Sequence, residues 1–381
     1  MSKKLKLLSL LLFPLSILIN TIGSKYPYFI EKYYSTTVNK FIVETLSKIT
    51  SVVPFSVFEI IVYITFISIL LFIIYFIYTI IKYPKKLKSF IKNSILNILS
   101  IISIVYFLFI ILWGLNYNRL PLEVTIIDNY NLKYNKSITK VEKNNEDLKN
   151  LYKYLIEKSN ETRKLVKTEN NIMKANSDYK GIIKRAYLGY ENITYIFPSI
   201  YGNYGNAKYI LSSNLMCYTG ITGIYFPFTG EANVNVGVPD LYIPSTTLHE
   251  MAHQRGYASE DEANFIAYLA SVNHPHIDFK YSGYILALNH TGNALYKADY
   301  EAYAELSKNI SEGVLKDLRN NSEFWDKYEG KIDEISNDIN NTYLKANGIS
   351  EGVKSYGKMV DLLLTYYKLY IFKNLFNISM K

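Results

Sequence analysis

The sequence predicts a mostly helical α+β membrane protein, with three N-terminal transmembrane helices followed by a soluble domain that contains a small β-sheet. Long apolar runs fill much of the first 115 residues, and helical periodicity dominates most of the remainder. Between these helical parts, residues 183–243 are rich in Gly, Pro, Tyr and Thr. The chain of 381 residues is long enough for two or more domains. We therefore expect a membrane domain over 1–115 and an extracytoplasmic domain over 116–381.

Three apolar runs are each close to the length of about 20 residues that a helix needs to cross the hydrocarbon core of a bilayer. They cover approximately 7–22, 57–81 and 94–113. Basic residues precede the first run, as in a signal peptide, but no small-residue cleavage motif follows it. We interpret this run as an uncleaved anchor, so the lipid bilayer is an expected partner.

The distribution of lysine predicts the orientation of the spans. Lysine is concentrated before the first apolar run and in the 82–93 segment, whereas Glu31 and Glu44 partly offset the lysines of the 24–56 loop. The positive-inside rule then places the N-terminus in the cytoplasm and residues 116–381 outside. This topology accounts for the net charge of +9. The sequence has no nucleic-acid-binding motif, and we expect no nucleic-acid partner.

The periodicity of the soluble part predicts its elements in order. Apolar residues at helical spacing among charged residues predict an amphipathic helix over 134–175. Short β-prone runs predict a sheet within 183–243, with a strand at 231–238. Further helices are expected over 246–255, 259–273, 279–306, 310–345 and 354–375. Within the last of these, the apolar stretch 359–372 is too short and too charged to span a membrane, so we expect it to pack against the soluble core. The single cysteine, Cys217, excludes an internal disulfide and a cysteine-rich metal site.

The residues with the clearest chemical pattern lie in "TTLHEMAHQRGYASEDEANFIAYLAS", residues 246–271. His249 and His253 are four positions apart, so a helix places both imidazoles on one face, where they can reach one metal ion. Glu250 is rotated by about 100° around the helix axis, close to the metal without having to bind it. A general base for a metal-activated water has this position. A capping box of Thr247 and Glu250 would explain the glutamate but neither histidine.

A hydrolytic zinc site has three protein ligands and one open position. Gly256 is expected to end the first helix, and Ser259 to cap the next one. Glu260 then begins the second helix and can face the metal, whereas Glu262 is expected to be the capping-box partner of Ser259. Asn264, one turn later, is a candidate to orient a ligand histidine. We predict that Zn²⁺ is bound by His249, His253 and Glu260, with Glu262 as the rival third ligand.

The HExxH motif followed by E-x-x-A-N is similar to gluzincin metallopeptidases, including CAAX-type, HtpX-like and ImmA/IrrE-like peptidases. Over its whole length the chain resembles the DUF3810 family of bacterial membrane proteins. This resemblance rests on residues 113–122, 223–235, 249–271 and 355–364. It implies a zincin-like zinc peptidase of a bacterial cell membrane, without indicating a substrate. In two respects the chain departs from known patterns: the insert between His253 and Glu260 is shorter than gluzincins usually have, and Ser259 stands where metzincins place a third histidine.

Hydrolysis of a peptide bond also needs a group that stabilises the developing oxyanion. Our candidate is Tyr356, which lies in a family-like segment at an expected loop-to-helix boundary, and His290 is the alternative.

Further polar residues have open interpretations. The 229–240 strand is either an exposed edge that binds an extended peptide or a core strand. Glu231 on this strand is either a ligand for a substrate amine or a surface residue. His274 and His276 are expected to face solvent, with a secondary metal site as the alternative.

Together these features predict a membrane-anchored, zinc-dependent metallopeptidase that hydrolyses peptide bonds of exported, membrane-linked or envelope substrates. The same residues would serve a protein substrate or the stem peptide of peptidoglycan. The alternative is a zinc-containing receptor with little or no turnover. The expected cytoplasmic parts, about 1–6 and 82–93, are small for a signalling output, which favours the enzyme.

Overall fold

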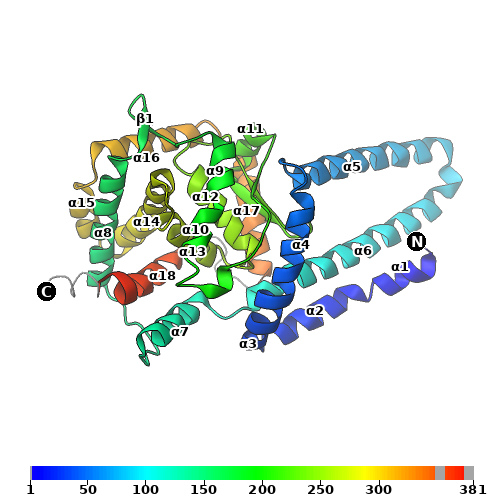
Figure 1. The fold of residues 1–381 in the computed structure, drawn as a ribbon. Helices are drawn as coiled ribbons and strands as arrows, with labels where there is room; N and C mark the ends of the chain where they lie inside the picture. The colour runs from blue at the N-terminus through cyan, green and yellow to red at the C-terminus, as the bar shows by residue number, and fades with distance from the viewer. Residues whose placement is uncertain (1, 348–356, 373–381) are drawn as a thin grey trace.

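A computed structural model describes residues 2–347 and 357–372, and the predicted fold class is confirmed. The described residues are mostly helical, with two small sheets and three long apolar helical segments near the N-terminus. In Figure 1 the apolar helices project from one side of a helical body that contains most of the other described residues.

The three segments that are long and apolar enough to cross a membrane are Lys3–Gly23, Val57–Lys82 and Pro84–Leu112. The first consists of α1 (Lys3–Ser9) and α2 (Leu12–Gly23), and the second is α5 (Val57–Lys82). The third joins the 3-10 turn η2 (Pro84–Lys86) to α6 (Leu87–Leu112). This helix begins before the apolar run at 94, because residues 87–93, a mixture of polar and apolar side chains, contain no Gly or Pro and continue it. The orientation of the spans stays a prediction.

The segment between the first two spans packs on the helical body. It contains α3 (Pro27–Phe29), the π-helical η1 (Ile30–Asn39) and α4 (Lys40–Thr50). The carboxylate of Glu31 forms a bidentate ion pair with Arg119, with both N–O distances at 2.8 Å. This ion pair joins residues on the two sides of the domain boundary that the sequence predicts after residue 115. The boundary stays a prediction.

The main core lies in the helical body and extends from Leu122 to Tyr370. In it, α14 (Ile277–Ala298) packs between α8 (Asn145–Arg163) and α13 (Glu260–Val272). The last described elements, α18 (Met359–Tyr366) and η7 (Tyr367–Phe372), pack into this core, as predicted for residues 359–372. The remaining short helices are η3 (Gly114–Asn118), α9 (Tyr179–Arg185), α10 (Tyr187–Glu191), η4 (Pro198–Ile200), α11 (Ser213–Met216) and η5 (Cys217–Thr219).

Several expected helices are interrupted. The single helix predicted over 134–175 is wrong: α7 (Leu122–Tyr134) ends at the left-handed Asn135, and α8 is followed by the hairpin of β1 (Lys167–Glu169) and β2 (Ile172–Lys174). The hairpin turn is formed by two asparagines with positive φ, Asn170 and Asn171.

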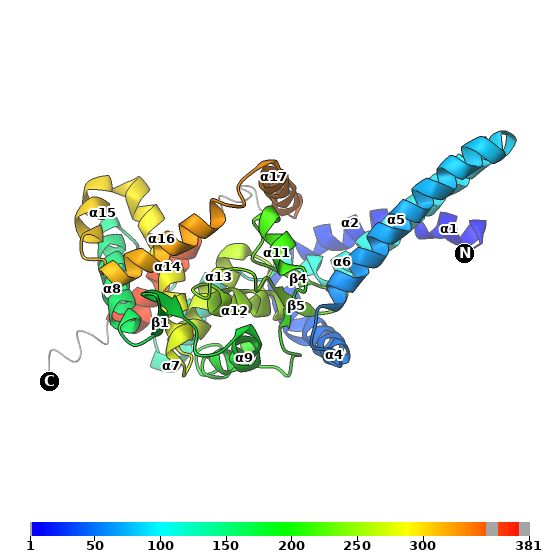
Figure 2. The same ribbon diagram turned by 90° about the horizontal axis from the view of Figure 1, so that it is seen from above.

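The two long C-terminal helices are also divided. Asp299 ends the predicted 279–306 helix because its side chain accepts the Ala302 N–H and caps α15 (Tyr300–Ser307). The predicted 310–345 helix consists of α16 (Glu312–Trp325) and α17 (Lys331–Ala346), with Gly330 at the N-cap of the second. Figure 2 shows α17 standing apart from the other C-terminal helices, beside α11.

The three-stranded sheet has the order β3–β5–β4, formed by β3 (Lys208–Tyr209), β5 (Glu231–Val234) and β4 (Gly223–Phe226). The central strand β5 pairs parallel to β3 and antiparallel to β4, with Ile224 opposite Asn233. It ends at Val234, before the predicted end at 238, and all of its residues are buried. Of the two interpretations of this strand, the core strand is therefore correct and the exposed edge is wrong.

Candidate metal centre

The HExxH motif lies on α12 (Ile243–Gln254), which packs against β4, β5 and α13. Two hydrogen bonds end this helix, from Gly256 N–H to the His253 carbonyl (2.8 Å) and from Tyr257 N–H to the Ala252 carbonyl (3.2 Å). This is the pattern of a Schellman motif, and Gly256 has the positive φ of 81° that it needs. The predicted glycine stop is confirmed, and it turns the chain directly into α13.

The turn brings Glu260 against the two histidines of α12. Oε2 of Glu260 lies 3.1 Å from Nε2 of His249 and 3.6 Å from Nε2 of His253. One ligand atom from each of the three residues lies within 4.8 Å of the others, so the group could hold a metal ion. The three residues predicted as zinc ligands are thus brought together.

Two contacts orient the ring of His253. Its Nδ1 donates to the carbonyl of Tyr257 at 2.7 Å, and its Nε2 is directed toward Glu260. The indole of Trp113, at the end of α6, meets the imidazole edge-on with 5.8 Å between ring centroids. The sequence did not indicate either contact, although Trp113 begins one of the family-like segments.

The two histidines and Glu260 change one another's pKa values. Burial alone would raise the pKa of Glu260, but the two histidines outweigh burial and hold it well below its usual value. Burial likewise opposes the protonated form of His253, but the adjacent Glu260 carboxylate raises the pKa of that imidazole. A dication would interact with the same carboxylate, which is ionised near neutral pH.

Glu250 lies beside this group without belonging to it. It is buried, and its Oε2 has no hydrogen-bond partner among the described residues. Burial raises the pKa of this carboxyl to about 7, although the two histidines lower it. The space for its side chain depends on Gly223 of β4, where an added Cβ would lie 2.4 Å from Oε1 of Glu250.

Glu262 has a different role from the one predicted. Ser259 precedes α13, but its side chain makes no capping hydrogen bond, so the predicted capping box is wrong. Oε1 of Glu262 instead accepts the N–H of Leu122 at 2.7 Å, at the first residue of α7. The carboxylate is drawn there because the first N–H groups of a helix have no partner within the helix. Glu262, the alternative third ligand, therefore has a structural role in capping α7.

A cavity of about 1040 Å³ opens above the three candidate ligands. Its lining is mainly apolar and aromatic, and it includes Phe109 of the third candidate span, Trp113 directly after that span, strand β4 and one face of α17. Asn264 also lines the cavity, but within the described ranges no hydrogen bond joins its side chain to a ligand histidine. His249, His253, Glu260 and Glu250 all line this cavity.

The candidate oxyanion donors differ in their position relative to the cavity. His290 lines the cavity, whereas Tyr356 lies outside the described residues. Two tyrosines not singled out from the sequence, Tyr117 and Tyr343, line the cavity with their hydroxyl oxygens 3.2 Å apart. Burial raises the pKa of both hydroxyls, which keeps them protonated as hydrogen-bond donors.

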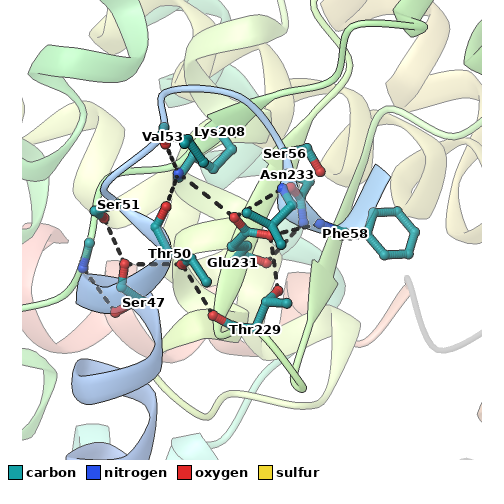
Figure 3. A network of polar contacts seen from close by, with 12 residues as sticks. Ser47, Thr50, Ser51, Val53, Ser56, Phe58, Lys208, Thr229, Glu231 and Asn233 are labelled. Carbon is teal, nitrogen blue, oxygen red and sulfur yellow. Dashed lines mark hydrogen bonds and ion pairs between the residues drawn. The ribbon is translucent and has the colours of Figure 1, made fainter. Parts of the chain in front are cut away.

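Glu231 is neither a surface residue nor a cavity residue. It is 1% exposed, and its carboxylate accepts the N–H groups of Val57 (3.2 Å) and Phe58 (2.9 Å) at the start of α5. Lys208 lies 3.7 Å away, and Thr229 donates its hydroxyl to the same carboxylate. Figure 3 shows this network joining the sheet to the second candidate span. Both predicted interpretations of Glu231 are therefore wrong, because helix α5 uses the charge for its own N-terminus.

His274 and His276 lie away from the candidate ligands. His274 is fully buried and stacks on Phe279, with its Nε2 3.0 Å from the carbonyl of Arg185. The predicted solvent exposure is wrong for His274, whereas His276 is partly exposed. Neither belongs to a group of metal-ligating side chains within the described residues.

The fold and the site define a protein with three candidate membrane spans and a His-His-Glu group that could hold a metal ion. Residues 34–364 match the model of a family described as "Protein of unknown function (DUF3810)". The chain therefore belongs to the DUF3810 family, as its resemblance implied. Neither a curated protein nor a solved structure matches it.

Proposed function

We propose that this protein is a membrane-anchored, zinc-dependent metallopeptidase. The observation that carries the proposal is the juxtaposition of three ligand side chains with Glu250, whose buried Oε2 has no partner among the described residues. A structural metal site would need the ligands but would not need a neighbouring unpaired carboxylate.

The donor set fits Zn²⁺. Two imidazoles and one carboxylate match the ligands of hydrolytic zinc sites, and three protein ligands leave one position open. His249, His253 and Glu260 would hold the ion, and the carbonyl of Tyr257 fixes the imidazole of His253 for this task.

When bound, zinc would act as a Lewis acid that polarises the scissile carbonyl and lowers the pKa of a nearby water. Glu250 accepts a proton from that water as its oxygen attacks the carbonyl carbon. The same carboxyl then returns the proton to the nitrogen as the C–N bond breaks. Its pKa of about 7 suits both transfers, because proton affinity near the working pH favours accepting and releasing a proton. The hydroxyl of Tyr343 accepts the hydrogen bond that Tyr117 donates, so its own O–H is the candidate oxyanion donor.

The cavity supports a peptide as substrate. On its outer edge, β4 has no strand partner among the described residues, and its residues line the cavity. An extended peptide could therefore pair with the free edge of β4. This edge replaces β5, the strand that the sequence suggested for peptide binding. We propose peptide or protein substrates of the cell envelope, since Phe109 of a candidate span lines the same cavity. With the N-terminus cytoplasmic, the site lies on the extracytoplasmic side of a bacterial membrane.

The test uses the full chain, purified in detergent, with metal content and hydrolysis of a quenched peptide library measured together. We expect one zinc per chain in the wild type and in Glu250→Gln, with hydrolysis lower by about a thousandfold in the variant, as removal of a catalytic base costs. Glu260→Gln should lose zinc, whereas Glu262→Gln should keep it. Equal hydrolysis by wild type and Glu250→Gln would exclude the proposed chemistry, and a folded wild type without zinc would exclude the metal site.

A further inference from the structure

A second cavity, of about 380 Å³, lies on the other face of the metal-binding helix. Met251 and Arg255 line it, and at 100° per residue they lie roughly opposite His249 and His253 on α12. The deep part of this cavity is formed by Arg255, Met251 and Ile200, which are buried, and the rim by Tyr187, Tyr201 and Asn203, which are exposed. It is separate from the cavity above the candidate metal centre.

Arg255 is unusual among the buried charges of this protein. Its guanidinium carbon lies close to two aromatic rings, 3.7 Å from the centroid of Tyr190 and 4.5 Å from that of Tyr204. The side chain is 8% exposed, and Nη1 donates to the carbonyl of Met251 at 3.0 Å. In the part of the chain that the structure describes, no carboxylate forms an ion pair with it, and its buried Nε has no hydrogen-bond partner.

This arrangement leaves one edge of the guanidinium for a ligand. The rings of Tyr190 and Tyr204 both lie against the guanidinium, and Nη1 is used within the helix, so Nε and Nη2 are the donors without a hydrogen-bond partner among the described residues. That edge presents two parallel N–H donors, which match the two oxygens of a carboxylate. A buried, charged donor without a hydrogen-bond partner is energetically unfavourable, so a bound anion would stabilise it.

The other charges around the cavity select the kind of anion. Glu191 lines the rim, and Glu44 lies close by, with its Oε1 accepting the N–H of Asn203 at 2.8 Å. Two carboxylates beside one guanidinium disfavour a doubly charged anion and tolerate a singly charged one. The aromatic walls suit an apolar or aromatic body, and the volume is that of a small-molecule site.

We propose that this cavity binds a small monocarboxylate, anchored side-on by the guanidinium of Arg255 and enclosed by tyrosine rings. The proposal is independent of the peptidase function, because none of its residues belongs to the candidate metal centre.

The test is calorimetric titration of the full chain in detergent with benzoate, its uncharged analogue benzamide, and inorganic phosphate. We expect benzoate to bind about tenfold or more tightly than the other two probes. Arg255→Lys should weaken benzoate binding by a similar factor, because an ammonium cannot offer two parallel donors. Equal binding of benzoate and benzamide, tighter binding of phosphate, or no binding of benzoate to the folded wild type would each overturn the proposal.

A second variant protects the test against misfolding of Arg255→Lys. Asn203→Trp places a large ring at the exposed rim without changing a buried side chain. It should abolish benzoate binding and leave the melting temperature unchanged, whereas Asn145→Trp, at an exposed position on α8, should change neither. Full benzoate binding by Asn203→Trp would show that the ligand lies elsewhere.

Discussion

Glu250 and Gly223 are a matched pair, since the buried carboxylate of one occupies the space that a side chain on the other would need. Gly223→Ala should therefore displace Glu250 while leaving the three metal ligands in place. We expect a loss of at least about tenfold in peptide hydrolysis with zinc content unchanged, because misplacing a general base mainly affects the chemical step.

The control for this variant is Gly330→Ala, since no atom lies within 4 Å of a Cβ added there. If Gly223→Ala also lost zinc, the strand would be supporting the ligands and the base alike.

Because His274 is buried, we expect the stability of the folded protein to decrease in acid, whether or not a metal ion is bound. Burial lowers the pKa of His274 to about 4, and its Nδ1 accepts the N–H of His276, which a second ring proton would block. Between pH 6.5 and 4 the unfolded chain binds a proton that the folded chain does not, so stability falls as the pH decreases through this window. The loss amounts to up to about 3 kcal/mol.

The measurement is the melting temperature against pH for wild type and His274→Gln. Glutamine can keep both hydrogen bonds, so the variant should show a smaller decrease between pH 6.5 and 4, while His276→Gln should behave as the wild type does. Identical profiles for wild type and His274→Gln would refute this assignment.

For single residues, the sequence predicted those positions in the site that depend on local helix and turn geometry. The spacing of His249 and His253, the turn at Gly256 and the start of a helix at Glu260 are all short-range, and the three ligands lie together. The partners of Glu231 and Glu262 were not predictable, because the helix N-termini that they contact are far away in the sequence. Burial of His274 was missed for the same reason.

Among the elements, the junction of α5 with the sheet depends on one buried charge pair. Glu231→Gln would leave Lys208, which is 3% exposed, without its counter-ion. Removing one partner of a buried pair costs roughly 3–5 kcal/mol, so the melting temperature should fall markedly. Glu231→Gln combined with Lys208→Met should recover part of the loss.

The comparison for this variant is Glu161→Gln, which breaks a surface pair with Lys158 and should cost less than about 1 kcal/mol. A similar small effect for Glu231→Gln would mean that the span is held by its backbone contacts alone.

Most element types followed from periodicity, except the β1–β2 hairpin, which was predicted as helix, but pairing and interruption did not. The apolar runs predicted three long helices near the N-terminus, while the order β3–β5–β4 needs contacts between strands that local patterns do not encode. Breaks such as that at Asp299 depend on one capping residue within an otherwise helical pattern.

For the whole molecule, the orientation of the spans can be tested by cysteine labelling in intact cells. The native Cys217 is buried, so it should give little background. A cysteine at the exposed Leu165 should react with a membrane-impermeant maleimide from outside, whereas one at Lys88 should react only after permeabilisation. The reverse pattern would place the site in the cytoplasm.

Phe109 in the third candidate span and Trp113, the residue directly after that span, form part of the wall around the candidate metal centre. A fragment that consists of residues 116–381 would therefore lack the ring that meets His253, and its cavity would be open on one side. For the proposed peptidase, the third candidate span would thus form part of the site as well as anchor the protein. Removing residues 1–115 would then abolish the proposed activity, so the helical body alone would not be a working enzyme.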